Sequence, residues 1–277
     1  MSEKRVPAPV VAAACLVRRH DEMAPGSRLI PEETPIAFTY GGSTHAVMMA
    51  TPADLEDFAA GFALTEGLIG PQAGPLEVEI VASELGVELR SWLPGEGQRQ
   101  YAARRRSMAG PTGCGLCGIE SLEQAAREPP QVGEGFRVES TRLIAAMQRM
   151  PDSQTVNRQT RAVHGAAFWR PFDDLLILRE DVGRHNALDK LAGALLRGGV
   201  SGKDGVVLMT SRVSVELVQK AARIGAPLIA AISAPTALAV RTAEACGMTL
   251  VAVMRGRDFE VFTHPERIVE SAPAHVA

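Results

Sequence analysis

Residues Val206-Val207-Leu208-Met209-Thr210-Ser211-Arg212-Val213-Ser214 form an apolar run of four that ends abruptly in hydroxyl groups and a cation. A short continuous apolar run bounded by polar residues is typical of a strand that is covered on both faces of a sheet. The residues that follow carry helical periodicity and predict a helix from Val213 to Ile224. The order of strand, polar turn and helix predicts one unit of an alternating α/β fold.

The same unit recurs along the C-terminal half of the chain. Further strands are predicted at Leu175–Leu178, Leu228–Ile232 and Leu250–Met254, with helices at residues 184–196 and 236–246. Gly198, Gly225 and Gly247 stand where helix C-cap glycines belong. The fold class is therefore α/β, with a three-layer C-terminal domain over residues 153–277. In such sheets ligands bind at the carboxyl ends of the strands.

Residues 1–152 predict a smaller α+β N-terminal domain. Its first 50 residues indicate strands, and a helix is expected to begin with Thr51 as N-cap and to end at Gly67. Alternating apolar residues predict further strands within residues 71–100. A short helix is expected over residues 119–127, and another over residues 141–150 with Pro151 as its stop.

The bulk properties of the chain narrow its class. With 277 residues, a formal net charge of −3 and 46% hydrophobic residues, it has the composition of a globular protein with no general affinity for nucleic acid or anionic membranes. No apolar run reaches the roughly 18 residues of a membrane span. Cys15 and Cys246 lie in apolar surroundings, and we expect both to be buried thiols rather than disulfide partners. These features predict a reduced, cytoplasmic protein.

Cys114 and Cys117 form a CxxC pair among three glycines, in a chain with only four cysteines. Such a pair can hold half a zinc site, cycle as a dithiol, or carry sulfur as a persulfide. Zinc is disfavoured because the other Cys and His residues lack ligand spacing, and a thioredoxin-type dithiol because the loop does not follow a strand. The basic run Arg104–Arg106 favours a reactive thiolate, although it is also typical of a solvated turn. All three uses stay open at this point.

Polar residues gather where three predicted strands end. They comprise Glu180 to Lys190, Thr210 to Ser214, and Ser233 to Thr236. The first set is explained equally by a solvated helix start and by ligand binding. In the second, Thr210 or Ser211 could be an N-cap, or the backbone amides with Arg212 could hold a phosphate. The three sets together suggest a pocket for a nucleotide, although the chain lacks a GxGxxG or Walker-type loop.

The chain resembles a known family, the formate dehydrogenase accessory sulfurtransferases or FdhD-type sulfur carriers. The likeness covers nearly the whole chain and rests on several long motifs in one order. These motifs are Thr51 to Phe62 with Thr65-Glu66-Gly67, Thr112 to Gly118, Glu180 to Lys190, Thr210 to Lys220, and Phe259 to Arg267.

The resemblance implies a sulfurtransferase that takes persulfide sulfur from a cysteine desulfurase. It would deliver this sulfur to the molybdenum cofactor, as bis-molybdopterin guanine dinucleotide, before the cofactor enters formate dehydrogenase. It implies Cys114 and Cys117 as the persulfide-forming pair, a cytoplasmic homodimer, and a cytidine-deaminase-like C-terminal domain that binds the guanine nucleotide moiety. The implied cofactor-binding segment consists of Phe259, Glu260, Val261, Phe262, Thr263 and His264.

By their placement, Arg184 and His185 are expected to contact the same cofactor. No metal site is expected, because His164-Gly165-Ala166 lacks the Glu of the deaminase H-x-E motif and no later cysteine pair exists. Two alternatives stay open: a non-catalytic chaperone that binds the cofactor and docks the dehydrogenase, and a structural loop held by zinc.

Overall fold

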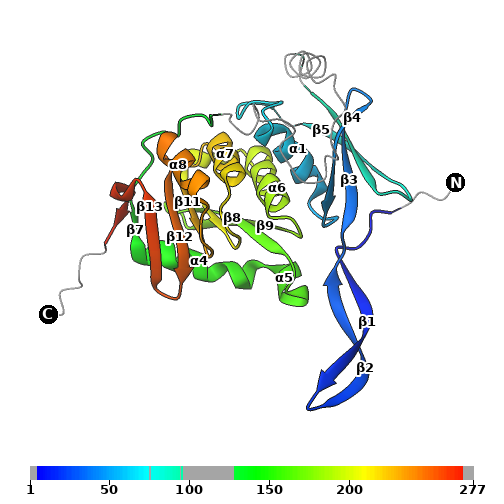
Figure 1. The fold of residues 1–277 in the computed structure, drawn as a ribbon. Coiled ribbons are helices and arrows are strands. Elements are labelled where there is room, and N and C mark those ends of the chain that lie inside the picture. Colours follow the sequence, from blue (N-terminus) through cyan, green and yellow to red (C-terminus); the bar gives the residue numbers. More distant parts are fainter. Residues whose placement is uncertain (1–4, 75, 94, 96–127, 271–277) are drawn as a thin grey trace.

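The computed structural model describes residues 5–74, 76–93, 95 and 128–270. Cys114, Cys117, Arg104–Arg106 and the helix expected over residues 119–127 lie outside these ranges, so the predictions made for them stay predictions. The described chain is mixed α/β, with a large sheet, a smaller sheet, and a two-stranded ribbon that projects from the body (Figure 1).

The large sheet has six strands in the order β13-β12-β11-β10-β8-β9. Its strands are β8 (His164–Arg170), β9 (Leu175–Asp181), β10 (Val206–Met209), β11 (Leu228–Ala231), β12 (Thr249–Arg255) and β13 (Asp258–Thr263). Strands β10, β11 and β12 are parallel, whereas β8 is antiparallel to both β10 and β9. The four predicted C-terminal strands are confirmed. Strands β8 and β13 were not predicted.

The large sheet is covered on both faces, as predicted, but one covering helix lies almost entirely before residue 153, where the predicted C-terminal domain begins. Helices α6 (Arg184–Arg197), α7 (Val215–Ile224) and α8 (Ala237–Ala245) cover one face of the large sheet, and α4 (Ser140–Ser153) covers the other (Figure 1). Strand β10 shows why both faces must be covered, because Val207 packs in the cluster of α6 and α7 while Leu208 packs in the cluster of α4. The burial of each such aliphatic side chain stabilises the folded protein by about 1.5–3 kcal/mol.

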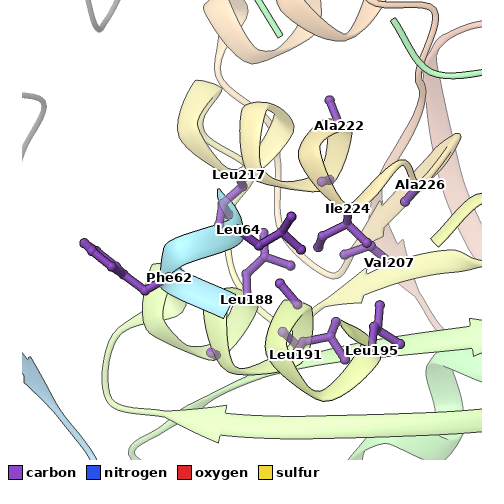
Figure 2. Close-up of a cluster of buried hydrophobic side chains, with 14 of the residues drawn as sticks. Phe62, Leu64, Leu188, Leu191, Leu195, Val207, Leu217, Ala222, Ile224 and Ala226 are labelled. Atoms are coloured by element: carbon purple, nitrogen blue, oxygen red, sulfur yellow. The ribbon is translucent and has the colours of Figure 1, made fainter. Parts of the chain in front are cut away.

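The smaller sheet has the order β4-β3-β6-β5 and lies under helix α1 (Leu55–Thr65). Its strands are β3 (Thr34–Tyr40), β4 (Ser43–Ala50), β5 (Glu77–Ala82) and β6 (Val87–Trp92). Phe62 of α1 stacks on Phe38 of β3, with ring centroids 4.0 Å apart. On the other side, Leu64 of α1 meets Leu188 of α6 and Leu217 of α7 (Figure 2). Helix α1 therefore belongs to the cores of both sheets.

Two helix boundaries differ from the prediction. Helix α1 begins at Leu55 rather than after Thr51, and its N-cap Asp54 takes a left-handed φ of 53°. Thr51 does not cap the helix because its polar groups bond to the end of strand β9. Helix α4 continues through Pro151 to Ser153, because Pro151 removes only one donor and Gln154 N still donates to Met150 O at 3.1 Å. Helix α5 (Thr155–Thr160) follows.

The remaining elements are short, apart from one long ribbon. Strands β1 (Val10–Arg19) and β2 (Glu22–Pro31) pair only with each other. Strand β7 (Val138–Glu139) pairs with β14 (Ile268–Val269), and two 3-10 turns lie at Gly202–Asp204 and Pro265–Arg267.

The two described cysteines have different environments. Cys246 is 1% exposed, as predicted. Cys15 is exposed on the ribbon, so the prediction that it is buried is wrong. The ribbon projects from the body, so Cys15 lacks the covering layers of a buried strand, which a strand pattern alone cannot reveal. Within the described ranges, no helix is both long and apolar enough to cross a membrane.

Candidate functional site

The predicted polar sets do meet at one edge of the large sheet. Strands β9, β10 and β11 run in the same direction, since β8 is antiparallel to β9 and β10 and β11 is parallel to β10. Their carboxyl ends therefore lie at the same edge of the sheet, with the start of β8 between β9 and β10. Val213 forms a parallel bridge with Pro235 in the next turn. We call the residues at these ends the strand-end site. Helices α6, α7 and α8 begin there and turn their N-termini toward it.

Glu180 and Asp181, which open the first polar set, are structural residues. Both are buried, at 6% and 0% exposure, so the expectation of a solvated helix start is wrong for them. Glu180 accepts hydrogen bonds from the backbone N–H groups of Val156 and Asn157, each at 2.8 Å, at the start of α5. A carboxylate at that position satisfies amides that have no partner inside the helix.

Asp181 joins the strand-end site to the N-terminal part of the chain. Its Oδ2 lies 2.6 Å from Lys190 Nζ, and both side chains are fully buried. The same oxygen accepts from Thr51 N at 3.0 Å, while Lys190 Nζ donates to Thr51 O at 2.7 Å. Thr51 Oγ1 in turn accepts from Val182 N. Three residues from separate elements therefore satisfy one another's charges and hydrogen bonds in the interior.

His185 is hydrogen-bonded to a carboxylate in the strand-end site. Its Nε2 is 2.7 Å from Glu216 Oε2 and 3.3 Å from Ser214 Oγ. Because a carboxylate only accepts, Nε2 carries a proton that points to Glu216. The hydrogen bond from His185 lowers the pKa of Glu216 below its ordinary value and outweighs the opposing effect of burial. Glu216 and Ser214 come from the α7 segment, which sequence reasoning had not linked to His185.

Arg184 lies beside this pair with unused donor capacity. Its Nε is buried, and among the described residues it has no hydrogen-bond partner. No ion pair to its guanidinium is found within those residues either. An arginine at the first position of a 14-residue helix, next to backbone amides of the N-terminus, is well placed to bind an anion.

His164 enters the site from strand β8, where it pairs in register with Asp181. Burial, followed by the charge of Arg184, lowers the pKa of His164, and the charge of Asp181 only partly opposes them. The imidazole is therefore held neutral at a pH where an exposed histidine begins to protonate. Sequence reasoning used His164 only to exclude deaminase chemistry and missed this position.

For the second polar set the N-cap interpretation is wrong, whereas the phosphate-binding interpretation stays a prediction. The N-cap of α7 is Ser214, without a side-chain cap bond, rather than Thr210 or Ser211. Thr210 Oγ1 accepts from Gly165 N at 2.9 Å, which ties the end of β10 to β8. Ser211 is buried and donates to Arg212 O. Arg212 of this set is exposed, and Ser214 is half-buried beside His185. In the third set, Thr236 caps α8 by accepting from Ala239 N.

The segment from Phe259 to His264 lies elsewhere in the sheet. Phe259 to Thr263 belong to β13, an edge strand, whereas Arg184 and His185 follow β9 at the opposite edge. Five strand spacings of ~4.8 Å, roughly 24 Å, separate these edges. His264 takes a left-handed φ of 48° and its Nε2 lies 3.1 Å from Glu244 O. The structure therefore does not bring the two predicted groups together within one chain.

A second buried cluster forms around Asp189, the residue before Lys190. Lys220 Nζ donates to Asp189 Oδ1 and Oδ2 at 2.8 and 3.0 Å, and to Thr65 Oγ1 at 3.1 Å. Thr65 Oγ1 donates to Asp189 Oδ1 at 2.6 Å. The cluster ties α1, α6 and α7 together. The sequence signal for it was a set of polar residues spaced within otherwise apolar helices.

Helices α1 and α6 also approach one another unusually closely. A Cβ at Gly61 would overlap the carbonyl oxygen of Asp189 and lie 2.6 Å from Gly193 N. A Cβ at Gly193 would likewise overlap the carbonyl oxygen of Asp57. Only glycine fits at this crossing, because any side chain would meet backbone on the facing helix. The two buried clusters and the glycine contact fix α1 against the strand-end site.

Neither thiol of the predicted pair can be placed, because Cys114 and Cys117 lie outside the described residues. Among the residues described, no group of three His, Cys, Asp or Glu side chains could hold a metal ion. The zinc-held loop stays a hypothesis, since its cysteines are not among those residues.

The fold and the strand-end site define a class: three-layer α/β proteins with a cation-bearing edge and a second sheet docked through a shared helix. Within this class the chain belongs to the FdhD/NarQ family, whose sequence profile matches residues 31–269. This assignment confirms the resemblance drawn from the motifs.

Curated relatives and a solved structure agree with this family. The chain is 55% identical over 252 residues to the sulfur carrier protein FdhD of Agrobacterium fabrum, covering 91% of this chain and 93% of the relative. It is 51% identical to the Brucella abortus protein of the same name, with 92% and 96% covered. A crystal structure from Desulfotalea psychrophila, described as a formate dehydrogenase accessory protein, aligns with a TM-score of 0.73 and 27% identity over 94% of this chain and 99% of that one.

Proposed function

We propose that this protein is a sulfur carrier that serves formate dehydrogenase. The observation that carries the proposal is the likeness to proteins named sulfur carrier protein FdhD over nearly the full length of both chains. The solved relative described as a formate dehydrogenase accessory protein supports the same client. In this proposal the protein acts in the cytoplasm as a homodimer.

The proposed chemistry is persulfide transfer through Cys114 and Cys117. The thiolate of Cys114 attacks the terminal sulfur of a persulfide on a cysteine desulfurase. A bond forms between the two sulfurs, the donor S–S bond breaks, and the donor cysteine leaves as a thiolate, so the step involves no net oxidation. The protein is then a sulfurtransferase, with the terminal sulfur bound to Cys114.

Delivery of that sulfur to molybdenum as sulfide requires two electrons. Cys117 supplies them if its thiolate attacks the inner sulfur of the Cys114 persulfide, because the products are a Cys114–Cys117 disulfide and hydrosulfide. If Cys117 instead acts as a second carrier, an external thiol supplies the two electrons by attacking the inner sulfur and then forming its own disulfide, and Cys114 and Cys117 both stay free thiols. A count of free thiols before and after delivery therefore separates these two roles.

The molybdenum cofactor, in its bis-molybdopterin guanine dinucleotide form, is the proposed substrate of the delivery step. Arg184 and His185 would hold phosphate groups at the strand-end site, where helix N-termini and a free guanidinium favour an anion. Phe259 to His264 would contact the other part of the cofactor. Their separation of roughly 24 Å, from strand spacing, suits a ligand with two distant dinucleotide arms better than a single small nucleotide.

We also propose that the C-terminal domain is cytidine-deaminase-like. The strand order β9-β8-β10-β11-β12, with β8 antiparallel to its neighbours and helices on both faces, supports this assignment. Deaminase catalysis is not part of the proposal, because Ala166 stands where that chemistry needs a glutamate.

The test is to locate the persulfide by mass spectrometry after incubation with a cysteine desulfurase and cysteine. The wild-type protein should carry one additional sulfur, and Cys114→Ser should lose it. Cys15→Ser is the matched control, because Cys15 is an exposed thiol on the ribbon and its removal should leave the added sulfur in place. Undiminished persulfide in Cys114→Ser would exclude Cys114 as the carrier.

The same variants distinguish the non-catalytic chaperone. A chaperone that only binds the cofactor and docks the dehydrogenase should restore formate dehydrogenase activity with both Cys114 and Cys117 replaced by Ser. A sulfur carrier should not. Formate dehydrogenase activity in cells that lack the native protein and express the double variant is the measurement.

A further inference from the structure

The β1–β2 ribbon carries an apolar face that no other described element covers. Strict pairing of Val10 with Pro31 through to Arg19 with Glu22 assigns every side chain to one of two faces. One face bears Val11, Ala13, Arg28 and Ile30. It lies toward helix α5, where Arg28 Nη2 donates to Thr160 O at 3.1 Å. The other face lies on the opposite side of the ribbon, which projects from the body (Figure 1).

The outward face is almost entirely apolar. Leu16, Met23 and Leu29 on it are 68%, 60% and 42% exposed. The remaining positions of this face are Val10, Ala12, Ala14, Arg18, Pro25, Ser27 and Pro31. An isolated two-stranded ribbon is at best marginally stable in water, so a face of this kind requires a covering surface.

The charges of the ribbon argue against a lipid or nucleic-acid surface as that cover. Arg18 pairs with Asp21, and Arg19 stands opposite Glu22 in the register. The tip therefore carries both signs in balance and has no excess of basic residues to meet an anionic polymer or membrane. A balanced apolar surface is self-complementary, which suits a twofold contact between identical chains.

The area of the ribbon indicates how such a contact forms. A ribbon of two ten-residue strands presents roughly 340 Å² on one face, from a rise of ~3.4 Å per residue and a spacing of ~4.8 Å. Two ribbons face to face would bury only roughly 700 Å² in total, less than the ~1,000 Å² expected of a specific interface. Two arms that each lie on the body of the other copy bury roughly 1,400 Å², which falls within the ~1,200–2,000 Å² range of stable interfaces.

We infer that the β1–β2 ribbon is a dimerisation arm whose outward face, bearing Leu16, Met23 and Leu29, packs on a second copy of this chain. The contact is exchanged: each copy lends one arm and receives one. The inference rests on the homodimer of the proposed function and names its interface. It does not rest on sulfur transfer, so a wild type that dimerises without the ribbon would contradict the arm alone.

The test compares the full-length wild type with Leu16→Glu/Met23→Glu by sedimentation velocity over a range of micromolar concentrations. The wild type should sediment as a dimer, and the double variant as a monomer with a dimer Kd at least about tenfold higher. Phe172→Glu is the matched control, because Phe172 is 95% exposed in the turn between β8 and β9 and its replacement should leave the dimer intact.

A wild type that is monomeric throughout, or a double variant that dimerises as the wild type does, would overturn the inference. Amide hydrogen exchange guards against a variant whose ribbon has simply unfolded. In the wild type, the amides of Ala12 to Leu16 should become more protected as protein concentration rises. Exchange at these amides that is independent of concentration would also contradict the dimerisation arm.

Discussion

Lys190 Nζ lies 2.6 Å from Asp181 Oδ2, and neither side chain has any exposed surface. Both charges were moved out of water on folding, so their pairing offsets a large desolvation cost. The pair also holds the Thr51 segment against the end of strand β9. It thereby determines where Gly183 and Arg184 begin helix α6.

Replacing Asp181 with Ala should destabilise the protein by about 3–5 kcal/mol, because Lys190 is left buried and unpaired. Urea denaturation followed by circular dichroism measures the loss. Asp173→Ala is the control, since its pair with Arg170 lies at the surface, where an ion pair contributes little to stability. Equal losses for the two variants would show that the Asp181 pair is no stronger than a surface pair.

Alanine at Gly61 should destabilise the protein by about 1–3 kcal/mol or more, because the added methyl group forces helices α1 and α6 apart. Gly193→Ala should do the same from the facing helix. Gly70→Ala is the matched control, because a Cβ there meets nothing within 4 Å. The measurement is again the free energy of unfolding in urea, and an unchanged value for Gly61→Ala would contradict the close crossing.

Replacing Arg184 with Gln should weaken binding of a guanine nucleotide without loss of stability. Removal of one charged phosphate contact is expected to cost about 1.5–3 kcal/mol, or roughly tenfold or more in Kd. Calorimetric titration with GDP as the probe measures the change. Arg158→Gln, at an exposed position on α5, should bind GDP like the wild type. Identical affinities for the two variants would remove Arg184 from the proposed phosphate site.

Much of the C-terminal fold could be predicted because short apolar runs such as Val206–Met209 are unambiguous signals of covered strands. Strand β8 was missed because its small residues, from Gly165 to Ala167, lack the β-branched side chains typical of strands. Thr51 was assigned to a cap because its tertiary partners, Asp181 and Lys190, are about 130 residues away in the sequence.

The candidate site was likewise predictable only in part. The grouping of Arg184, His185 and Ser214 at one sheet edge followed from strand direction and was predictable. The burial of Glu180 as a cap for α5 was not predictable. A polar residue before a helix has the same sequence pattern whether solvent or backbone satisfies its hydrogen bonds. The separation of Phe259 from Arg184 depends on strand order, which local sequence does not encode.

The stability of the protein should depend on pH through His164. Burial and the charge of Arg184 lower the pKa of His164 from its ordinary value of 6.5. Below that pH the unfolded chain takes up a proton that the folded chain resists, so the free energy of unfolding falls as the pH is lowered. The slope from one such group is at most about 1.4 kcal/mol per pH unit.

Replacing His164 with Gln should remove this contribution. The difference between wild-type and variant unfolding free energies should be constant well above pH 6.5, where the unfolded histidine is neutral, and should change as the pH falls through 6.5. Glu216 does not disturb this window, because its lowered pKa means that its stabilisation is lost only below its ordinary value of 4.5. Asp181, Arg184 and His185 face His164 and are present in both proteins, so their effects largely cancel in the difference.

His20→Gln, in the exposed turn of the ribbon, should keep the wild-type slope. Parallel curves for wild type and His164→Gln across the window would show that His164 binds its proton equally well in the folded and unfolded chain.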